Sequence, residues 1–264
     1  MPYRIDFHTA GSDTFDRLVD LGALDAEVTS DRGIAALMPD SVSPDAVAGA
    51  LGVRAISVSP AIGRDAGSIW VLRPRPIRVG RIRIVPADMA PEAGAIRLID
   101  APSFGTGLHP TTMLCLEALD EVVPIAPPDA VLDVGTGSGV LALAALTLGV
   151  PRALGIDVDD DALCVAAENA RTNGMGERLQ LARGGPEATA GRWPLVLANV
   201  LAAPLIEMAP ELVRRVGHRG QLVLSGIPGA VEQDVDRTYR RLGMTRLSTK
   251  SRAGWVALLL RASW

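Results

Sequence analysis

The sequence predicts an α/β protein that combines a Rossmann-like seven-stranded sheet with a small N-terminal α+β domain of the ferredoxin-like kind. Two patterns predict this. From about residue 96 onward, short apolar segments alternate with helix-like segments, as they do in doubly wound parallel sheets. The first 60 residues instead follow the order strand, helix, strand, strand, helix, strand. A segment rich in proline, glycine and arginine separates the two patterns, so we expect domains at 1–60 and 96–264 and a linker at 61–95.

The composition is typical of a packed globular protein. The chain has 264 residues, of which 48% are hydrophobic and 21% charged, enough for one large domain and a small one. Its net charge of -4 provides no overall basic field, which disfavours strong non-specific binding to nucleic acid. We therefore expect no direct sequence-specific binding to nucleic acid either.

Signals for membranes, secretion and metals are missing from the sequence. The longest apolar run, 140–150, is too short to cross a bilayer. The N-terminus lacks the apolar core of a signal peptide, so we expect a cytoplasmic protein with no membrane partner. Cys115 and Cys164 have no cysteine or histidine at ligand spacing, and we expect no metal site.

The N-terminal segments are short and alternate in type. We expect strands at 4–9, 25–30, 33–38 and 54–59 and helices at 13–21 and 43–51. Pro44 suits the first position of the second helix, because its missing N–H would have no partner there. A unit of this kind is a recognition platform in many proteins, but it can equally serve only for packing. In the linker we expect one or two β segments around 77–85.

The alternation after residue 96 predicts the larger sheet. The candidate strands are 131–134, 153–158, 179–182, 195–199 and 221–225, and the candidate helices are 112–119, 140–148, 161–173, 204–216 and 231–242. The strands are apolar enough to be buried on both faces, as parallel strands are. Segments 244–250 and 255–261 close the chain as an antiparallel pair. Five parallel strands followed by a terminal hairpin is the layout of the sheet in S-adenosylmethionine-dependent methyltransferases.

A glycine loop joins the first of these strands to its helix. The segment is Val131-Leu132-Asp133-Val134-Gly135-Thr136-Gly137-Ser138-Gly139. Glycines let backbone N–H groups approach a ligand that a Cβ would block. Asp157 ends the next strand, 20 residues after Gly137, where a carboxylate accepts hydrogen bonds from both ribose hydroxyls. The loop and this carboxylate fit either NAD or S-adenosylmethionine.

Asp133 separates these two ligands. A dinucleotide would place its pyrophosphate beside this carboxylate, and like charges in a poorly solvated crevice repel strongly. S-adenosylmethionine has no phosphate and carries an ammonium and a sulfonium, so a nearby carboxylate is favourable. Two alternatives stay open, another nucleotide ligand and a role for Asp133 as a helix or turn cap.

The segment Phe104-Gly105-Thr106-Gly107-Leu108-His109-Pro110-Thr111-Thr112 precedes the sheet. It is rich in backbone and hydroxyl hydrogen-bonding groups, and a bound ligand would give those groups partners. Because it enters the larger domain shortly before the first parallel strand, we expect it to fold over the cofactor edge. His109 is a candidate for assisting proton removal from the acceptor, although a lone histidine often has only a structural role.

Asn199 ends a buried strand in the segment Leu195-Val196-Leu197-Ala198-Asn199-Val200-Leu201-Ala202. Its amide oxygen and a nearby backbone carbonyl can accept hydrogen bonds from an amine and aim the lone pair at a methyl carbon. Methyltransferases acting on planar nitrogens often have Asn-Pro-Pro-Tyr here, and this chain has no aromatic ring at that point. The pattern favours an amine acceptor, with a strand-terminal turn as the alternative.

The order of these motifs resembles the PrmA family, bacterial methyltransferases of ribosomal large-subunit protein eleven. The resemblance covers roughly 70–262 and rests on the segments 104–112, 133–139, 155–157, 199–202 and 224–227. Leu108 stands where the family pattern has threonine, and Pro102-Ser103 replaces a glycine-containing step. The resemblance implies S-adenosylmethionine as cofactor, S-adenosylhomocysteine as product, and trimethylation of lysine side chains and an N-terminal amine. It also implies that the N-terminal domain docks the ribosomal substrate.

The motifs and the resemblance together define the expected site. Asn199, His109 and Thr106 are the expected catalytic residues. The expected cofactor-binding residues are Phe104, Gly105, Thr112, Asp133, Gly135, Gly137, Gly139, Asp157, Val158 and Asn199. The predicted function is methyl transfer to protein amines, with a ribosomal large-subunit protein as substrate. The alternatives are methylation of another protein or a small molecule on the same core, or a non-catalytic binding module.

Overall fold

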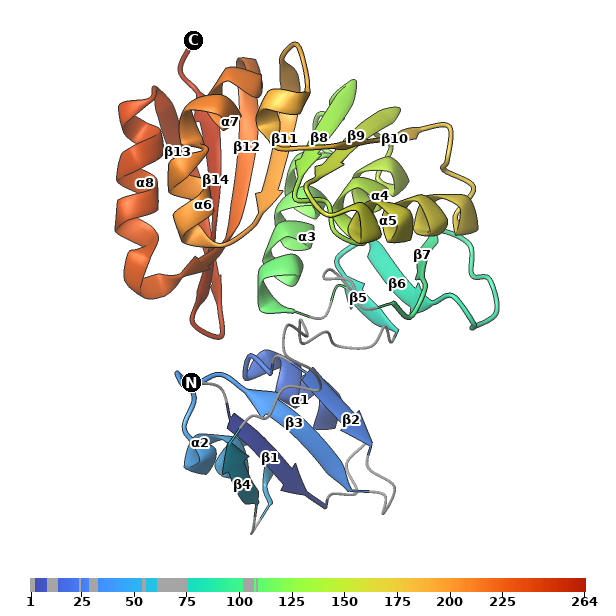
Figure 1. Ribbon diagram of the computed structural model, residues 1–264, viewed down its shortest axis with the longest axis vertical. Coiled ribbons are helices and arrows are strands. Elements are labelled where there is room, and N and C mark those ends of the chain that lie inside the picture. Colours follow the sequence, from blue (N-terminus) through green and yellow to red (C-terminus); the bar gives the residue numbers. More distant parts are fainter. Residues whose placement is uncertain are drawn as a thin grey trace.

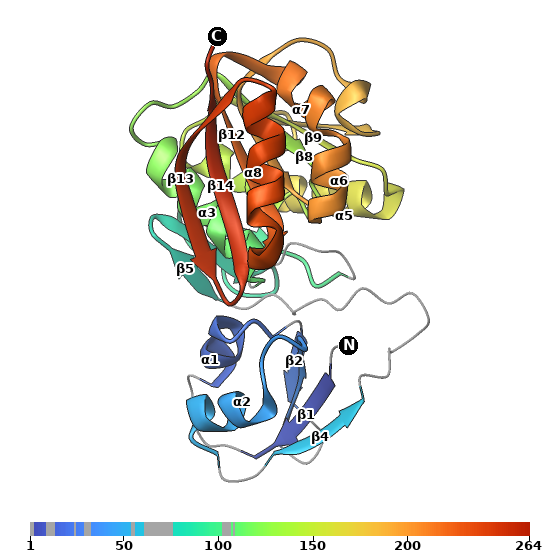
Figure 2. The same ribbon diagram turned by 90° about the vertical axis from the view of Figure 1, so that its left-hand side faces the viewer.

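The computed structural model describes most of the chain, in two parts that lie one above the other (Figure 1). The described residues are 3–8, 14–23, 25–28, 33–53, 56–60, 76–101, 107 and 109–264. The N-terminal unit, Tyr3–Pro60, has its own small sheet and lies below a larger sheet that has helices on both faces. The C-terminus lies at the end remote from this unit in both views (Figure 1, Figure 2).

The larger sheet has seven strands among the described residues, in the order β10-β9-β8-β11-β12-β14-β13. Its strands are β8 (Ala130–Val134), β9 (Arg152–Asp157), β10 (Leu179–Arg183), β11 (Trp193–Asn199), β12 (Val216–Pro228), β13 (Met244–Arg252) and β14 (Trp255–Ala262). Strands β8 to β12 are parallel, and β14 runs antiparallel to both β12 and β13. This confirms the predicted Rossmann-like sheet with its terminal antiparallel pair.

The strand order reverses between β8 and β11. From β8 the chain moves outward to β9 and β10, and it then returns to continue with β11 and β12 on the other side of β8. Ligands of open α/β sheets bind in the crevice at the carboxyl ends of the strands, where the order reverses. The glycine loop, Asp157 and Asn199 all follow or end strands at this edge.

Helices cover the two faces of the larger sheet and form a separate apolar core on each. One face carries α3 (Pro110–Val122), α4 (Val140–Thr147) and α5 (Asp160–Thr172), and the other carries α6 (Ala202–Glu207), α7 (Ala209–Arg215) and α8 (Glu232–Arg241). The prediction of one helix at 204–216 is wrong, because two helices meet there at Met208. Pro210 has no N–H to donate and its ring crowds the carbonyl four residues earlier, which ends α6. Short 3₁₀ turns lie at Pro186–Ala188 and Gly229–Val231.

A small three-stranded sheet packs beside the larger one. It consists of β5 (Ile77–Val79), β6 (Ile82–Pro86) and β7 (Ala95–Leu98). The β segments expected around 77–85 are therefore present, whereas β7 was not predicted. Ile82, Ile84 and Ile96 are buried in the same core as α3 and α4. This sheet leads the chain directly into the segment before α3.

The N-terminal unit has the arrangement predicted for it. Its elements are β1 (Tyr3–Phe7), α1 (Thr14–Asp20), β2 (Asp25–Val28), β3 (Ile34–Met38), α2 (Pro44–Leu51) and β4 (Ser57–Pro60). The strands pair antiparallel in the order β2-β3-β1-β4, which is the ferredoxin-like order. Ile5, Leu18 and Val47 are fully buried between this sheet and the two helices.

No helix within the described ranges is long and apolar enough to cross a membrane.

Candidate active site

The glycine loop between β8 and α4 is tied to the end of β9 by backbone hydrogen bonds. The N–H groups of Gly135 and Thr136 both donate to the carbonyl of Ile156, at 2.9 and 3.0 Å. Gly135 has a φ of +70°, and a Cβ there would lie 2.5 Å from Cγ1 of Val200. Only glycine therefore allows this close approach between the loop and the residue that follows β11.

Asp157 lies beside this loop at the end of β9, as predicted. Its Oδ2 accepts from the N–H of Gly137 at 2.9 Å, and its Oδ1 accepts from the N–H of Asp159 at 3.1 Å. Each carboxylate oxygen can accept a further hydrogen bond. The two contacts hold a half-buried carboxylate at the edge of the crevice, where it can receive a diol.

Asp133 lies under the loop and is only 1% exposed. Its Oδ2 accepts from the hydroxyl of Thr136 at 2.8 Å and from the N–H of Ala142 in the first turn of α4 at 3.3 Å. The contact with α4 supports the capping role left open above. Among the described residues, Oδ1 of Asp133 is buried and has no hydrogen-bond partner. An acceptor of this kind suits a cationic or hydrogen-bond-donating ligand.

Asp133 changes its charge at a higher pH than an ordinary aspartate does. Burial raises the pKa of this carboxyl to about 6, against the smaller lowering effects of the Thr136 hydroxyl and the Ala142 N–H. The nearby negative charge of Asp157 adds a smaller increase. At neutral pH the group is mostly ionised, and no salt bridge to it exists within the described ranges, so a positively charged ligand would stabilise it.

Asn199 and Thr112 come together from β11 and α3, although 87 residues separate them in sequence. The Asn199 amide donates to the Thr112 hydroxyl at 3.3 Å, which leaves Oδ1 of Asn199 as an acceptor. The Ser225 hydroxyl on β12 donates to the carbonyl of Thr111 at 3.0 Å. The first turn of α3 is thus held against the ends of two parallel strands.

His109 forms the N-cap of α3. Its Nδ1 lies 2.8 Å from the Thr111 hydroxyl and accepts from the Thr111 N–H at 3.4 Å. Burial lowers the pKa of His109 to about 4, so the ring is neutral at neutral pH and is a weak proton acceptor. The ring also meets the edge of Trp255, with 5.4 Å between centroids and 67° between planes. These contacts favour a positioning role.

Three of the expected site residues, Phe104, Gly105 and Thr106, lie outside the described residues, as does Leu108. Gly107 is described and has a φ of +86°, and a Cβ there would lie 2.7 Å from Cδ1 of Ile84 on β6. The small sheet therefore packs against the segment that leads to α3.

Val158 follows Asp157 and is 70% exposed. On the other side of the strand reversal, Leu201 is 63% exposed after β11. Single exposed apolar side chains are common, but these two flank the ends of β9 and β11. They offer apolar surface to a ligand or substrate lying across the carboxyl edge.

Two asparagines, Asn169 in α5 and Asn173 at the C-cap of that helix, support the site and were missed in the sequence. Asn169 is 1% exposed, donates to the carbonyl of Ser138 at 2.9 Å and accepts from the N–H of Ile99 at 2.9 Å. Asn173 accepts from the N–H of Arg97 at 2.8 Å and donates to its carbonyl at 2.8 Å. They connect the glycine loop to the strand before segment 102–106. Their spacing of four residues, which puts both on one helix face, was the available signal.

Comparison with known proteins agrees with this geometry. The family model described as ribosomal protein L11 methyltransferase (PrmA) matches residues 64–263. The chain belongs to the PrmA family. The earlier resemblance is confirmed, and the parallel sheet, the glycine loop and the capped α3 of this chain all lie within the matched residues.

Individual relatives carry the same name. The PrmA-family protein of Pelobacter propionicus is 39% identical over 212 residues, which is 77% of this chain and 69% of that protein. The one from Geobacter sulfurreducens is 41% identical over 191 residues, 70% of this chain, but the match spans only 62% of its length. A crystal structure of ribosomal protein L11 methylase from Lactobacillus delbrueckii subsp. bulgaricus has a TM-score of 0.65 at 29% identity, covering 71% of this chain and 98% of that one.

Proposed function

We propose that this protein uses S-adenosylmethionine to methylate amines of ribosomal protein L11, on lysine side chains and on the N-terminal amine. Membership of a methyltransferase family makes it a candidate methyltransferase, and the site supports the choice of donor. The observation that carries the proposal is the pair of acidic strand ends, Asp133 with a buried unpartnered oxygen and Asp157 beside the glycine loop. This pair suits a phosphate-free cation and repels a diphosphate.

The residues at the crevice fit this donor. We assign the ribose hydroxyls to Asp157, the adenine to the exposed face of Val158 and the cationic end to the buried side of Asp133. The backbones of Gly135, Gly137 and Gly139 would lie along the ligand. By family resemblance, Phe104, Gly105 and Thr112 complete the set. When bound, this cofactor supplies an electrophilic methyl group on a positively charged sulfur.

The residues of this chain would mainly position the acceptor amine for methyl transfer. Oδ1 of Asn199 would accept a hydrogen bond from the acceptor amine, while the Thr112 hydroxyl holds the other end of the same amide. His109 would fix the first turn of α3 in place, and Thr106 would lie beside the acceptor. A lysine acceptor must lose its proton first, and lowering its pKa from about 10.4 to about 7 corresponds to roughly 4–5 kcal/mol. A poorly solvated site beside a cationic sulfur favours the neutral amine.

We assign substrate docking to the N-terminal domain at 1–60, joined through 61–95 to a catalytic domain at 96–264. The separate core of the N-terminal unit supports the boundary after residue 60, while β5 and β6, which lie within 61–95, are buried in the core of the catalytic part. A ribosomal protein substrate implies that the enzyme acts in the cytoplasm, where that protein is made.

Mass spectrometry tests the proposal directly. Recombinant ribosomal protein L11 from the same organism is incubated with the enzyme and S-adenosylmethionine, and peptides are mapped. We expect methylene-sized mass increments on lysines and on the N-terminal amine, absent without enzyme. Methylation confined to another residue type would contradict the amine assignment. Calorimetry with S-adenosylhomocysteine tests the cofactor separately, and folded protein that binds none would contradict the donor assignment.

A further inference from the structure

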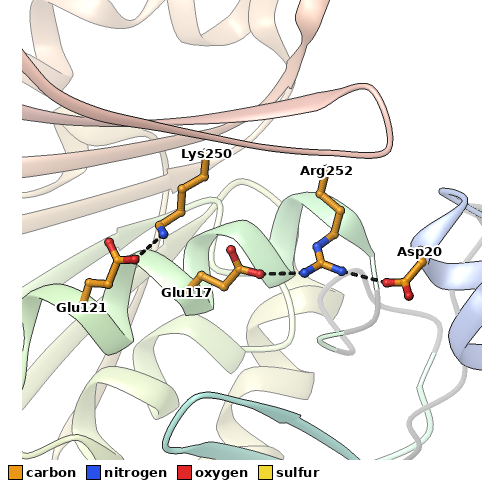
Figure 3. Close-up of polar contacts among 5 residues, drawn as sticks. All are labelled: Asp20, Glu117, Glu121, Lys250 and Arg252. Atoms are coloured by element: carbon orange, nitrogen blue, oxygen red, sulfur yellow. Dashed lines mark hydrogen bonds and ion pairs between the residues drawn. The ribbon is translucent and has the colours of Figure 1, made fainter.

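The hairpin between β13 and β14 joins the two parts of the molecule through one arginine. Nη1 of Arg252 lies 2.7 Å from Oδ1 of Asp20, the last residue of α1 in the N-terminal unit. Nη2 of the same guanidinium lies 2.9 Å from Oε1 of Glu117 on α3. Figure 3 shows Arg252 between these two carboxylates, which come from different parts of the chain.

Further contacts bring the same elements together. Gly22 follows α1, and a Cβ at that position would lie 3.1 Å from the Cβ of Ala253 in the hairpin turn. Met113, in the first turns of α3, and Ile77 on β5 pack against the core of the N-terminal unit. The unit therefore has both an apolar and an ionic contact with the catalytic part.

The position of Asp20 is itself informative. A carboxylate at the carboxyl end of a helix faces the negative end of the helix dipole, which is unfavourable. The contact with Arg252 offsets this cost, because the guanidinium lies between the helix end and the hairpin. Asp20 at this position therefore contributes to the contact between the two parts and not to the stability of α1.

The same hairpin also reaches the candidate active site. Trp255, three residues after Arg252, meets the ring of His109, which caps α3. Since β14 runs antiparallel to β12, the hairpin lies at the carboxyl edge of the sheet, level with Pro228. Arg252 thus lies where the N-terminal unit, α3 and the edge of the crevice meet.

We propose that Arg252 is a positioning residue that sets the orientation of the N-terminal unit relative to the methyl-transfer site. The planar guanidinium can meet two carboxylates at once, which a lysine ammonium does less well. Glu117 holds the side chain in place, so less rotamer freedom is lost when Asp20 binds. The catalytic consequence rests on the proposed function, because it needs the N-terminal unit to dock the substrate.

The structure offers variants that separate this role from simple stabilisation. Asp20→Asn removes the ion pair between the two parts, and Glu117→Gln removes the ion pair within the catalytic part. Lys250→Gln is a matched control, since Lys250 pairs with Glu121 and joins the same hairpin to the same helix (Figure 3). That pair does not involve the N-terminal unit. Arg252→Lys tests the need for a forked cation.

Distance measurement by paired fluorophores provides the first readout and needs no methylation. Labels are placed at Ala50→Cys on α2 and Glu177→Cys before β10, with the exposed Cys164 changed to serine. We expect Asp20→Asn and Arg252→Gln to broaden the distance distribution, added salt to do the same in the parent protein, and Lys250→Gln to leave it unchanged. Arg252→Lys should fall between the parent and Arg252→Gln. An unchanged distribution in Asp20→Asn, or equal broadening in Lys250→Gln, would overturn the proposal.

Kinetics on ribosomal protein L11 provide the second readout. We expect Asp20→Asn to raise KM for the protein about two- to five-fold, the range of an exposed ion pair, with kcat and S-adenosylhomocysteine affinity unchanged. A loss in kcat with KM unchanged would contradict a positioning role. If the distance distribution responds as expected while neither the parent enzyme nor any variant methylates ribosomal protein L11, the proposed function fails and the structural role of Arg252 stands.

Discussion

The crevice and the contact between the two parts of the molecule are held by different interactions. In the crevice, Asp133 and Asn169 are buried polar side chains, each only 1% exposed. At the contact, the side chains of Arg252, Asp20 and Glu117 keep exposures between 28% and 63%. Buried hydrogen bonds hold one geometry because breaking them is costly, whereas exposed ion pairs are weak and are screened by salt. The proposed methyl transfer therefore takes place in the crevice, which buried hydrogen bonds hold in one geometry. The proposed substrate docking depends on the contact between the two parts, which weak ion pairs allow to adjust.

The largest expected effect tests the rigidity of the crevice. Gly226 on β12 has a φ of +85°, and a Cβ there would collide with the backbone carbonyl of Val200. We expect Gly226→Ala to lower the free energy of unfolding by about 3–5 kcal/mol, measured by chemical denaturation. Gly94→Ala is the control, because its φ is +74° but the space around it is open. It should cost only about 1–2 kcal/mol, and equal losses would show that the strand ends are not tightly packed.

Asn199→Ala is expected to affect turnover most strongly. Removing the amide takes away the proposed acceptor for the substrate amine but leaves Asp157 and the glycine loop intact. We expect kcat to fall about 100-fold, with the Kd of S-adenosylhomocysteine changed much less. Steady-state kinetics and calorimetry provide the two numbers. A parallel loss in both would contradict the assignment of Asn199 to the acceptor amine.

Asp157→Ala should act on binding instead. Loss of the charged hydrogen bonds to the ribose is expected to weaken cofactor affinity by about 1–3 kcal/mol. Asp159→Ala is the matched control, since Asp159 lies in the same turn but caps α5 through the N–H of Asp161. That variant should lose about 1 kcal/mol of stability while its cofactor affinity stays the same. Calorimetry that finds both variants equally weak would remove Asp157 from the ribose site.

Asp133 should make cofactor affinity depend on pH. Because burial raises its pKa to about 6 in the free protein, the carboxyl binds a proton below that pH. A cationic ligand favours the ionised form, so affinity should fall as pH falls through 6, and Asp133→Asn should show weaker, flat affinity there. Affinity of the parent protein that stays constant from pH 5 to about 7.5 would contradict this.

Asp133→Asn should weaken cofactor binding but increase the free energy of unfolding. The folded protein keeps the Asp133 proton up to a higher pH than the unfolded chain does, so rising pH between about 4 and 6 weakens folding. Asp133→Asn should therefore be more stable than the parent at neutral pH, and this advantage should shrink at pH 5 and below. Thermal denaturation at both pH values measures it.

The smallest expected effect lies in the exposed network. Lys250→Gln removes a partly exposed ion pair with Glu121 and should change the free energy of unfolding by less than about 1 kcal/mol. Cofactor affinity should not change. A larger loss would mean that the hairpin is held more rigidly than its exposure indicates.

Much of the site could be predicted because its signals are local. The glycine spacing, the carboxylate at Asp157 and the strand-terminal Asn199 each lie within a strand and the turn after it. Asp133 was expected to suit a cation, but its contact with Ala142 and its unpartnered oxygen depend on how α4 packs. The sequence indicated a proton-acceptor role for His109. It did not indicate that His109 caps α3 by accepting from the Thr111 N–H, or that burial lowers the pKa of the ring. Those properties come from the surroundings and not from the motif.

The sequence by itself determined the alternation of strands and helices and the chemistry of the residues at the ends of the parallel strands, whereas the order of those strands in the sheet came from the structure. Hydrophobic periodicity and turn residues act over a few positions, so they can be recognised without the fold. The tertiary structure decided the contacts made across long separations, such as Asn169 with Ile99 over 70 residues and Arg252 with Asp20 over 232. No local pattern encodes such partners, because they meet only when separate cores have packed.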